Sequence, residues 1–192
     1  MKIFCIGTWK TGTTSIGNAI SVLTNGSHVN WKNGKNAIDL YLSNKTDEVF
    51  KIANNYDSFD DAPWNCYGIW QKLYKHFAES KFILSIRDDE KWFDSMTRWY
   101  FGNLEKRKSK IDLVKLYYLQ LHPYGFNVHK MKELDKSKKD WIEWYNIRNN
   151  NILNTIPKER LLIMDASDGW KPICNFLEVS VPSYHFPHLN KN

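Results

Sequence analysis

The chain has 192 residues and a formal net charge of +6, with 27 Lys and Arg residues against 21 Asp and Glu residues. This length suits one compact domain that buries most of its apolar surface. The positive charge favours an anionic ligand or partner, but it does not choose between a nucleotide, a nucleic acid and an acidic polysaccharide. No apolar run approaches the roughly 20 residues that a membrane-spanning helix requires.

Cysteine usage indicates the compartment. The three cysteines, Cys5, Cys66 and Cys174, are widely spaced and form no CxxC motif. An odd number in this arrangement argues against a disulfide framework and against a zinc site, so we expect a cytoplasmic, reducing environment. The segment Met1–Gly7 leads directly into the first motif, and we therefore expect no signal peptide.

The first predicted elements surround a loop rich in glycine and threonine. The apolar run Lys2–Gly7 predicts a buried strand, Gly7–Thr14 predicts a loop, and the spacing of apolar residues in Ser15–Leu23 predicts a helix. A strand, a glycine loop and a helix in this order open many phosphate-binding α/β folds.

Helices and strands continue to alternate along the chain. The pattern predicts helices over Trp70–Phe77, Glu90–Tyr100, Trp141–Asn154 and Trp170–Leu177, and strands over Lys81–Ile86 and Arg160–Met164. This alternation is typical of the α/β class. We expect a three-layer P-loop-type fold, with a mostly parallel central sheet flanked by helices.

Three segments fit this alternation less well. Gly26–Asn36 is polar and rich in Gly and Asn, which predicts a loop. Residues of about 103–140 are rich in lysine and predict a helical insertion or lid within a single domain over 1–192. The tail Val179–Asn192 contains two prolines and is expected to be extended, on the surface or across the mouth of the site.

The glycine loop resembles a nucleotide-binding loop with its cation displaced. Gly7 and Gly12 keep the G-x-x-x-x-G spacing of NTPases, but Thr13 stands where those enzymes have lysine, and the lysine is Lys10. Backbone N–H groups and the positive end of the helix can still bind a phosphate. No clear carboxylate for magnesium follows the later strands, which favours a metal-free site. The alternative is a helix-capping loop that binds nothing.

A second pair of residues could bind another phosphate. Arg87 follows a predicted strand at the edge where open α/β sheets bind ligands, and Ser95 lies in the next predicted helix. A guanidinium and a hydroxyl suit a phosphate group. The alternative is that Arg87 pairs with Asp88 or Asp89 and that Ser95 faces solvent.

Taken together, these motifs resemble those of sulfotransferases, in a P-loop-like branch of that family. Lys10-Thr-Gly-Thr-Thr resembles the loop that holds the 5′-phosphosulfate of the donor, 3′-phosphoadenosine 5′-phosphosulfate (PAPS), and Arg87 with Ser95 matches the pair that binds its 3′-phosphate. Leu161–Leu177 and the tail Val-Pro-Ser-Tyr-His-Phe-Pro-His-Leu-Asn resemble the same branch. The resemblance implies that the donor is bound by Lys10, Thr11, Gly12, Thr13, Thr14, Ser15, Arg87 and Ser95.

The chain also departs from the pattern of that branch. Asp89 replaces the proline of its "RDP" motif, although Asp is also favoured at a helix start. Residues 26–55 and 103–140 match no part of the pattern. The acceptor is expected to bind there, so its identity stays open.

Sulfuryl transfer requires a group that removes the proton of the acceptor and a cation on the leaving oxygen. Lys10, assisted by Thr14, is the candidate cation. The segment before Ala62-Pro63 resembles the short strand of that branch that ends in Asp, which makes Asp61 the first candidate for the base and Asp60 the second. Alternatively, these carboxylates cap a helix around Pro63. His188 is the third candidate, because many sulfotransferases use histidine.

We therefore expect an enzyme that moves a sulfuryl group from PAPS to a hydroxyl or amine, releasing 3′,5′-adenosine bisphosphate (PAP). The acceptor would be a small molecule, a glycan or a lipid headgroup. The alternatives are a P-loop kinase or NTPase and a catalytically inactive nucleotide-binding module. We expect no metal, no nucleic-acid partner and no membrane span, and a homodimer stays open.

Overall fold

The computed structural model describes residues 1–32, 34–66, 68–106 and 134–189. The chain divides into two compact units, one made of Met1–Ile86 with Ile156–Asn192 and the other of Arg87–Thr155. The single domain expected over 1–192 stays a prediction. Most of the insertion expected at about 103–140 lies outside the described residues.

The first unit is built on a five-stranded sheet in which every strand pair is parallel. The strand order is β2-β3-β1-β4-β5. The strands are β1 (Ile3–Cys5), β2 (His28–Val29), β3 (Ser58–Asp60), β4 (Lys81–Ser85) and β5 (Leu161–Met164). The predicted α/β class is confirmed, and the described strands are entirely rather than mostly parallel.

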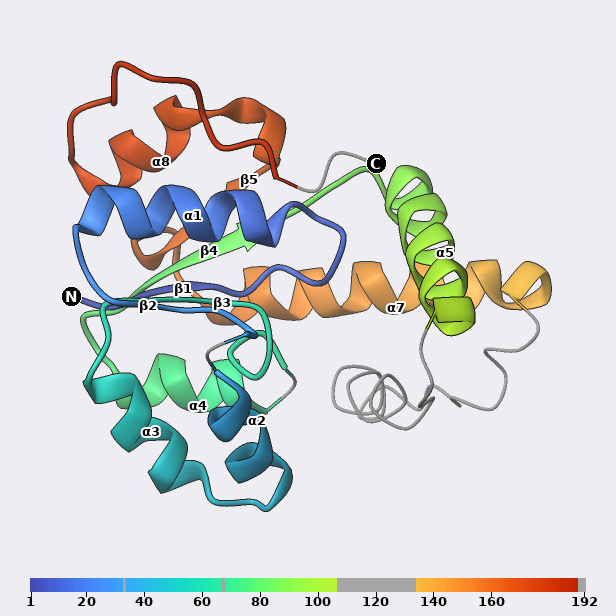
Figure 1. The fold of residues 1–192 in the computed structure, drawn as a ribbon, viewed down its shortest axis with the longest axis horizontal. Coiled ribbons are helices and arrows are strands. Elements are labelled where there is room, and N and C mark those ends of the chain that lie inside the picture. Colours follow the sequence, from blue (N-terminus) through green and yellow to red (C-terminus); the bar gives the residue numbers. More distant parts are fainter. Residues whose placement is uncertain (33, 67, 107–133, 190–192) are drawn as a thin grey trace. The chain divides into compact units, whose positions relative to one another are not determined.

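Helices cover both faces of this sheet (Figure 1). One face carries α1 (Thr13–Thr24) and α8 (Trp170–Leu177), and the opposite face carries α2 (Lys35–Leu42), α3 (Thr46–Asn54) and α4 (Ile69–His76). The first unit therefore has the three layers that the sequence predicts.

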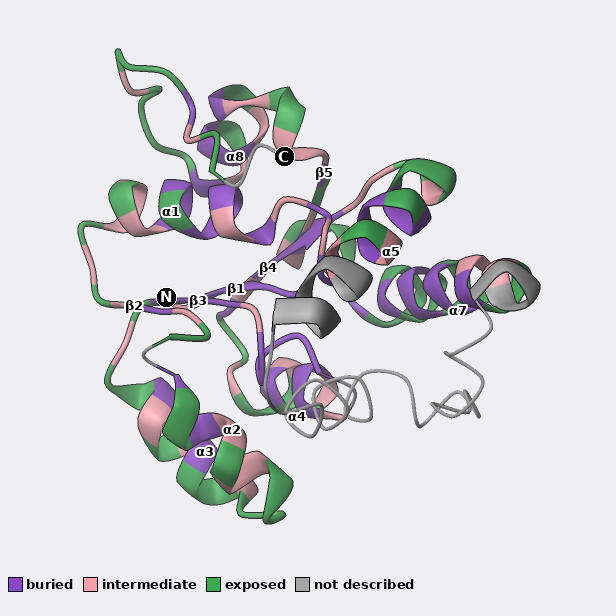
Figure 2. Ribbon diagram, turned by 45° about the vertical axis from the view of Figure 1, so that its right-hand side comes forward, coloured by how far each residue is buried: buried purple, intermediate pink, exposed green. Residues whose placement is uncertain are grey.

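The alternation of side chains along the strands produces two cores. Ile3, Cys5 and Ile83 pack with apolar residues of α1 and α8 on one face. Phe4 stacks on Phe59 and Phe82 on the other face, with ring centroids 4.6 and 5.5 Å apart. The inner strands β1, β3 and β4 are almost entirely buried, as Figure 2 shows, although β3 also carries the buried polar residues Ser58 and Asp60.

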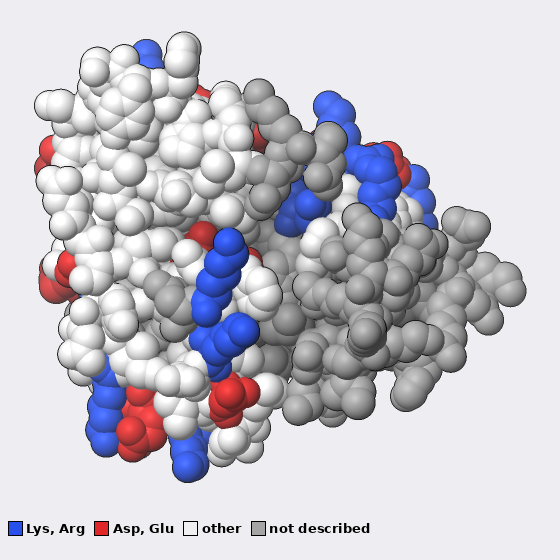
Figure 3. Space-filling model, viewed as in Figure 1, with Lys and Arg blue, Asp and Glu red and all other residues white. Residues whose placement is uncertain are grey.

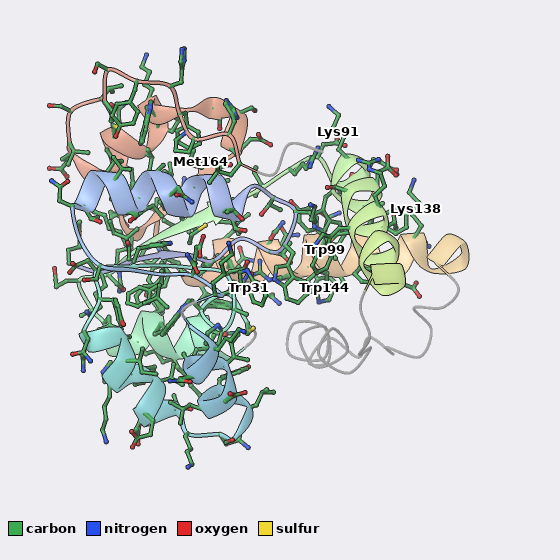
Figure 4. All side chains as sticks on the ribbon, in the orientation of Figure 1. Trp31, Lys91, Trp99, Lys138, Trp144 and Met164 are labelled. Atoms are coloured by element: carbon green, nitrogen blue, oxygen red, sulfur yellow. The ribbon has the colours of Figure 1, made fainter. Side chains whose placement is uncertain are left out.

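The second unit pairs α5 (Asp89–Lys106) with α7 (Leu134–Thr155). Trp92 of α5 packs on Trp141 and Trp144 of α7, with ring centroids 6.1 and 5.9 Å apart. Figure 4 shows Lys91 pointing away from both helices into solvent. Both helices are longer than the predicted segments Glu90–Tyr100 and Trp141–Asn154.

One prediction about the fold is wrong. Gly26–Asn36, expected to be a loop, contains β2 and the start of α2. The two residues of β2 pair with β3, in the register His28 to Ser58 and Val29 to Phe59. A strand this short is stabilised by its neighbour rather than by a pattern of its own. None of the helices in the described ranges has the length and apolar character needed to cross a membrane.

The parallel sheet determines where the candidate residues meet. The carboxyl ends of all five strands lie at one edge, and β1 is in the centre with β3 and β4 beside it. The glycine loop leaves β1 and Asp61 follows β3 directly. Ligands bind at this edge in open α/β folds, at the point where the chain turns to opposite sides of the first strand.

Candidate active site

The glycine loop reaches α1 through left-handed backbone conformations. Lys10 has φ 66° and Gly12 has φ 87°. At Gly12, a Cβ atom would also lie 2.4 Å from the Cβ of Ala166, in the short 3-10 helix Ala166–Asp168 after β5. The second glycine of the motif is therefore required by both conformation and space.

Hydrogen bonds inside the protein hold the loop in shape. The Thr11 hydroxyl donates to the carbonyl of Thr8 at 2.6 Å, and its oxygen also lies 2.6 Å from the Ser85 Oγ. Asn65 Nδ2 donates to the carbonyl of Gly7 at 2.9 Å. The hydroxyl of Thr11 therefore binds other groups of the protein. Its predicted contact with the donor would have to be made by its backbone N–H group.

The N-terminus of α1 opens into this loop without a capping side chain. Gly12 is the N-cap residue, the first turn carries no acidic residue, and the first backbone hydrogen bond runs from the Ile16 N–H to the Gly12 carbonyl. The opening N–H groups of a helix have no carbonyl of that helix to bind, and they carry its positive dipole. With Lys10 half-buried at the crown of the loop, this arrangement suits an anion.

Asp61 lies next to the glycine loop and is hydrogen-bonded to it. Its Oδ1 accepts a hydrogen bond from the Trp9 indole at 2.7 Å and another from the Ala62 N–H at 3.1 Å. Burial and then the charge of Asp60 raise the pKa of Asp61 to about 7, against the opposing effect of these two donors. A carboxylate with a pKa in this range can take up a proton at neutral pH.

Asp60 points away from that position, into the layer between the sheet and α1. It is buried, and a Cβ atom added to Gly17 of α1 would lie 2.0 Å from its Oδ2. Its Oδ1 lies 3.6 Å from His28 Nε2, and the pKa of Asp60 is raised by burial and lowered by His28. Of the two carboxylates predicted as bases, only Asp61 lies outside the layer between the sheet and α1.

The alternative in which the two carboxylates cap a helix does not describe the structure. The residues after Asp61 form turns, and the next helix, α4, begins at Ile69 with Gly68 as its N-cap. Asp61 binds Trp9 and the N–H of its own neighbour instead.

The tail brings His188 close to the start of α1. The Leu189 N–H donates to Ser15 Oγ at 3.0 Å, and Phe186 is buried in the core beside Trp170. His188 is exposed between these two anchors. The predicted extended tail therefore crosses α1, the helix that follows the glycine loop. The Ser15 hydroxyl accepts a hydrogen bond from this tail.

Arg87 and Ser95 belong to the second unit. The Tyr145 hydroxyl accepts a hydrogen bond from the Arg87 N–H and donates one to the Arg87 carbonyl, both at 2.9 Å. The ring of Tyr145 stacks on Trp92 with centroids 4.4 Å apart. Ser95 is 8% exposed, so the alternative in which it faces solvent is wrong.

Both neighbouring carboxylates have roles within the second unit. Asp88 Oδ1 accepts from the Lys91 N–H at 3.0 Å, which caps α5, and Asp89 Oδ2 accepts from Asn146 Nδ2 at 3.1 Å. Asp89, which replaces the family's proline, thus connects α5 to α7.

Charge on the visible face is mixed. Figure 3 shows Lys and Arg side chains over the region of α2 and α3, interspersed with Asp and Glu. The α1 helix itself contains no charged residue. That Lys10 and the N–H groups of the loop bind an anion stays a prediction. That the positive net charge favours an anionic ligand also stays a prediction.

Two residues of the site were missed by sequence reasoning. Trp9 lies inside the glycine motif, and its position there was the available signal. Tyr145 is 58 residues from Arg87, and nothing in its local sequence indicates the contact. No group of three or more metal-ligating side chains occurs within the described ranges, and a metal-free reaction stays a prediction.

Comparison with known proteins agrees with these motifs. A family model described as a sulfotransferase domain matches residues 2–192. The "Ava biosynthesis cluster protein M" of Aspergillus versicolor is 27% identical over 148 residues, which cover 72% of this chain and 56% of that protein. The chain thus spans little more than half the length of this relative. Because the family match extends over nearly every residue, the chain belongs to the sulfotransferase domain family.

Proposed function

We propose that the protein transfers a sulfuryl group from PAPS to a hydroxyl or amine of an acceptor and releases PAP. Membership of the family supports sulfotransfer in general. The donor, the acceptor and the residue roles are our inference. The observation that carries it is the hydrogen bond between Trp9 of the phosphate loop and Asp61, a carboxylate with a pKa of about 7.

The loop fits the 5′-phosphosulfate of such a donor. Its backbone is held by Thr11 and Asn65, and the N-terminus of α1 has no capping side chain. A phosphate placed there would accept hydrogen bonds from the N–H groups of Thr13 and its neighbours, in the positive field of the helix. Lys10, at the crown of the loop, would neutralise charge on the leaving oxygen.

The second unit would hold the 3′-phosphate through Arg87 and Ser95. Tyr145 holds both backbone polar groups of Arg87, which restricts where its side chain begins. A guanidinium and a serine hydroxyl together offer several donors to one phosphate. This assignment rests on the family motif and is supported by the burial of Ser95.

The chemical step balances with these residues. The acceptor oxygen or nitrogen forms a bond to sulfur, and the bond between sulfur and the oxygen of the 5′-phosphate breaks. The electron pair leaves with that phosphate oxygen, and the proton of the acceptor moves to Asp61. His188, the third candidate of the sequence analysis, is the alternative acceptor of this proton, from the tail that crosses α1.

Two other functions differ in their requirements. A kinase or NTPase would use ATP with magnesium and would have lysine at the position of Thr13. An inactive member would bind the nucleotide and would transfer no sulfuryl group to any acceptor. We prefer sulfotransfer to a kinase because of the family match and Thr13. We prefer it to an inactive member because a carboxylate suited to proton uptake lies beside the phosphate loop.

Ligand-induced thermal stabilisation tests the donor. The unfolding midpoint is measured with PAP or with ATP and magnesium, for the wild type, Arg87→Ala and Arg98→Ala. Arg98 is an exposed residue of α5 and serves as the matched control. A ligand at 100 times its Kd stabilises by about 2.7 kcal/mol, which corresponds to a shift of about 5–10 °C at this chain length.

We expect this shift with PAP in the wild type and in Arg98→Ala, and its near loss in Arg87→Ala. No shift with PAP, or a larger shift with ATP and magnesium, would overturn the proposal. For a protein that passes this test, consumption of PAPS in the presence of hydroxyl and amine acceptors distinguishes an enzyme from an inactive binding module.

A further inference from the structure

Trp9 joins the two parts of the site that sulfotransfer would have to coordinate. It lies within the phosphate loop, next to Lys10, and is 8% exposed. Its indole N–H donates to Asp61 Oδ1 at 2.7 Å, across 52 residues of sequence. The loop that would bind the donor and the carboxylate that would receive the proton are therefore connected by one side chain.

This hydrogen bond makes the two oxygens of Asp61 unequal. Within the described residues, both donors to this carboxylate, the Trp9 indole and the Ala62 N–H, bind Oδ1. A proton from an acceptor would accordingly be taken up by Oδ2. The short distance of the Trp9 contact is typical of a hydrogen bond to a charged acceptor.

The backbone on each side of the contact supports a functional constraint. Lys10 and Asp61 both lie in the left-handed region, with φ 66° and 63°. Non-glycine residues are uncommon there, and their occurrence at candidate catalytic positions suggests that the surrounding contacts hold them in place.

We propose that Trp9 is a positioning residue, which orients Asp61 so that Oδ2 receives the acceptor proton and which links this carboxylate to the donor loop. The proposal rests on the proposed function for its catalytic meaning. The contact between Trp9 and Asp61 can nevertheless be tested without any sulfotransfer.

The charged and titratable neighbours determine the sign of the effect. Asp60 of β3 raises the pKa of Asp61, and His28 lies beyond Asp60. Burial raises the pKa of the Cys5 thiol of β1 to about 12, so this neighbour stays neutral. The Trp9 N–H lowers the pKa of Asp61, and its removal must therefore raise that pKa further.

The first measurement needs no substitution. In the wild-type protein, the NMR signals of the Asp61 carboxyl carbon and of the Trp9 indole N–H are followed against pH. We expect both to titrate with one shared midpoint near neutral pH. Trp64, buried and without a hydrogen-bond partner for its indole nitrogen among the described residues, provides the internal control. A Trp9 signal that is unaffected by the Asp61 midpoint would overturn the proposal.

The second measurement uses Trp9→Phe, which keeps an aromatic ring and removes the donor. We expect the Asp61 midpoint to rise by about one pH unit, a tenfold change in its acid dissociation constant. In Trp64→Phe, the same substitution at a buried neighbour, we expect no rise. An equal midpoint in Trp9→Phe and the wild type would contradict the inference.

Two further readouts separate this inference from the proposed function. Once an acceptor is identified, Trp9→Phe should lower kcat about tenfold near neutral pH and should shift the acidic limb of the pH–rate profile to higher pH. The Kd for PAP should change less than threefold. If the wild type fails to bind PAP but the Asp61 midpoint rises in Trp9→Phe, the proposed function is wrong, and only the orientation of Asp61 by Trp9 stands. If PAP binds and the midpoint does not move, the positioning role is wrong.

Discussion

Replacing Asp61 by asparagine should make the protein more stable at neutral and alkaline pH. The folded protein raises the pKa of this carboxyl from 3.8 to about 7, because burial and Asp60 disfavour its charge. The folded state therefore keeps a proton that the unfolded state releases. The stability contributed by the neutral form is fully present below about pH 4 and is lost as the pH rises to about 7.

The size of the effect follows from this shift. A rise of about 3 pH units corresponds to about 4 kcal/mol of unfolding free energy, at about 1.36 kcal/mol for each unit. The amide side chain introduced by Asp61→Asn would keep an oxygen for the Trp9 N–H but would not titrate. The unfolding free energy of Asp61→Asn minus that of the wild type should thus increase by about 1.4 kcal/mol per pH unit between pH 4 and 7, then stay constant.

Urea denaturation of both proteins between pH 4.5 and 8.5 measures this difference. Asp39→Asn, at an exposed position of α2, controls for the loss of one negative charge from the protein as a whole. Asp60 titrates in both Asp61→Asn and the wild type, so the subtraction removes most of its effect. A difference that stays flat or decreases over this range would refute the argument that Asp61 is held in an environment unfavourable to its charge.

Three other substitutions test the site. Tyr145→Phe removes the hydroxyl that binds both backbone groups of Arg87, and calorimetry should show a Kd for PAP that is about fivefold higher, equivalent to about 1 kcal/mol. Gly12→Ala, with φ 87° and an added Cβ 2.4 Å from the Cβ of Ala166, should lower the unfolding free energy by about 2–3 kcal/mol. Gly68→Ala, with φ 80° and an added Cβ in ordinary contact with the Tyr41 hydroxyl at 4.0 Å, should lower it by only about 1 kcal/mol. Asp60→Asn removes the charge that raises the pKa of Asp61, so the Asp61 carboxyl titration followed by NMR should move to lower pH, opposite to the shift expected for Trp9→Phe.

The parts of the fold that could be predicted are those with a strong local pattern. The apolar run Lys81–Ser85 and the helix Trp170–Leu177 appear at almost the predicted residues. By contrast, β2 has two residues and carries no such pattern, because its stability comes from pairing with β3. Since β2 lies in Gly26–Asn36, its polar surroundings led to the wrong prediction of a loop.

The candidate site likewise contains residues that a local motif predicts and contacts that no local motif predicts. The glycine loop and Asp61 were predictable because each belongs to a short motif whose spacing carries information. The family motif ranked Asp61 before Asp60, but the sequence did not reveal that Asp60 lies beneath α1, against Gly17. The contacts of Trp9 with Asp61 and of Tyr145 with Arg87 join residues more than 50 positions apart, which a single sequence does not reveal.

The left-handed backbone at Lys10 and Asp61 has a practical consequence for engineering. Glycine at either position would relieve the local conformation, at a gain of about 1 kcal/mol, and would remove a side chain proposed for the chemistry. A random library selected only for heat resistance should therefore accumulate changes at these two positions. Glu178, with φ 59° and no proposed role in the site, should accumulate changes as well, so the left-handed positions that only a selection for activity protects would mark the reaction centre.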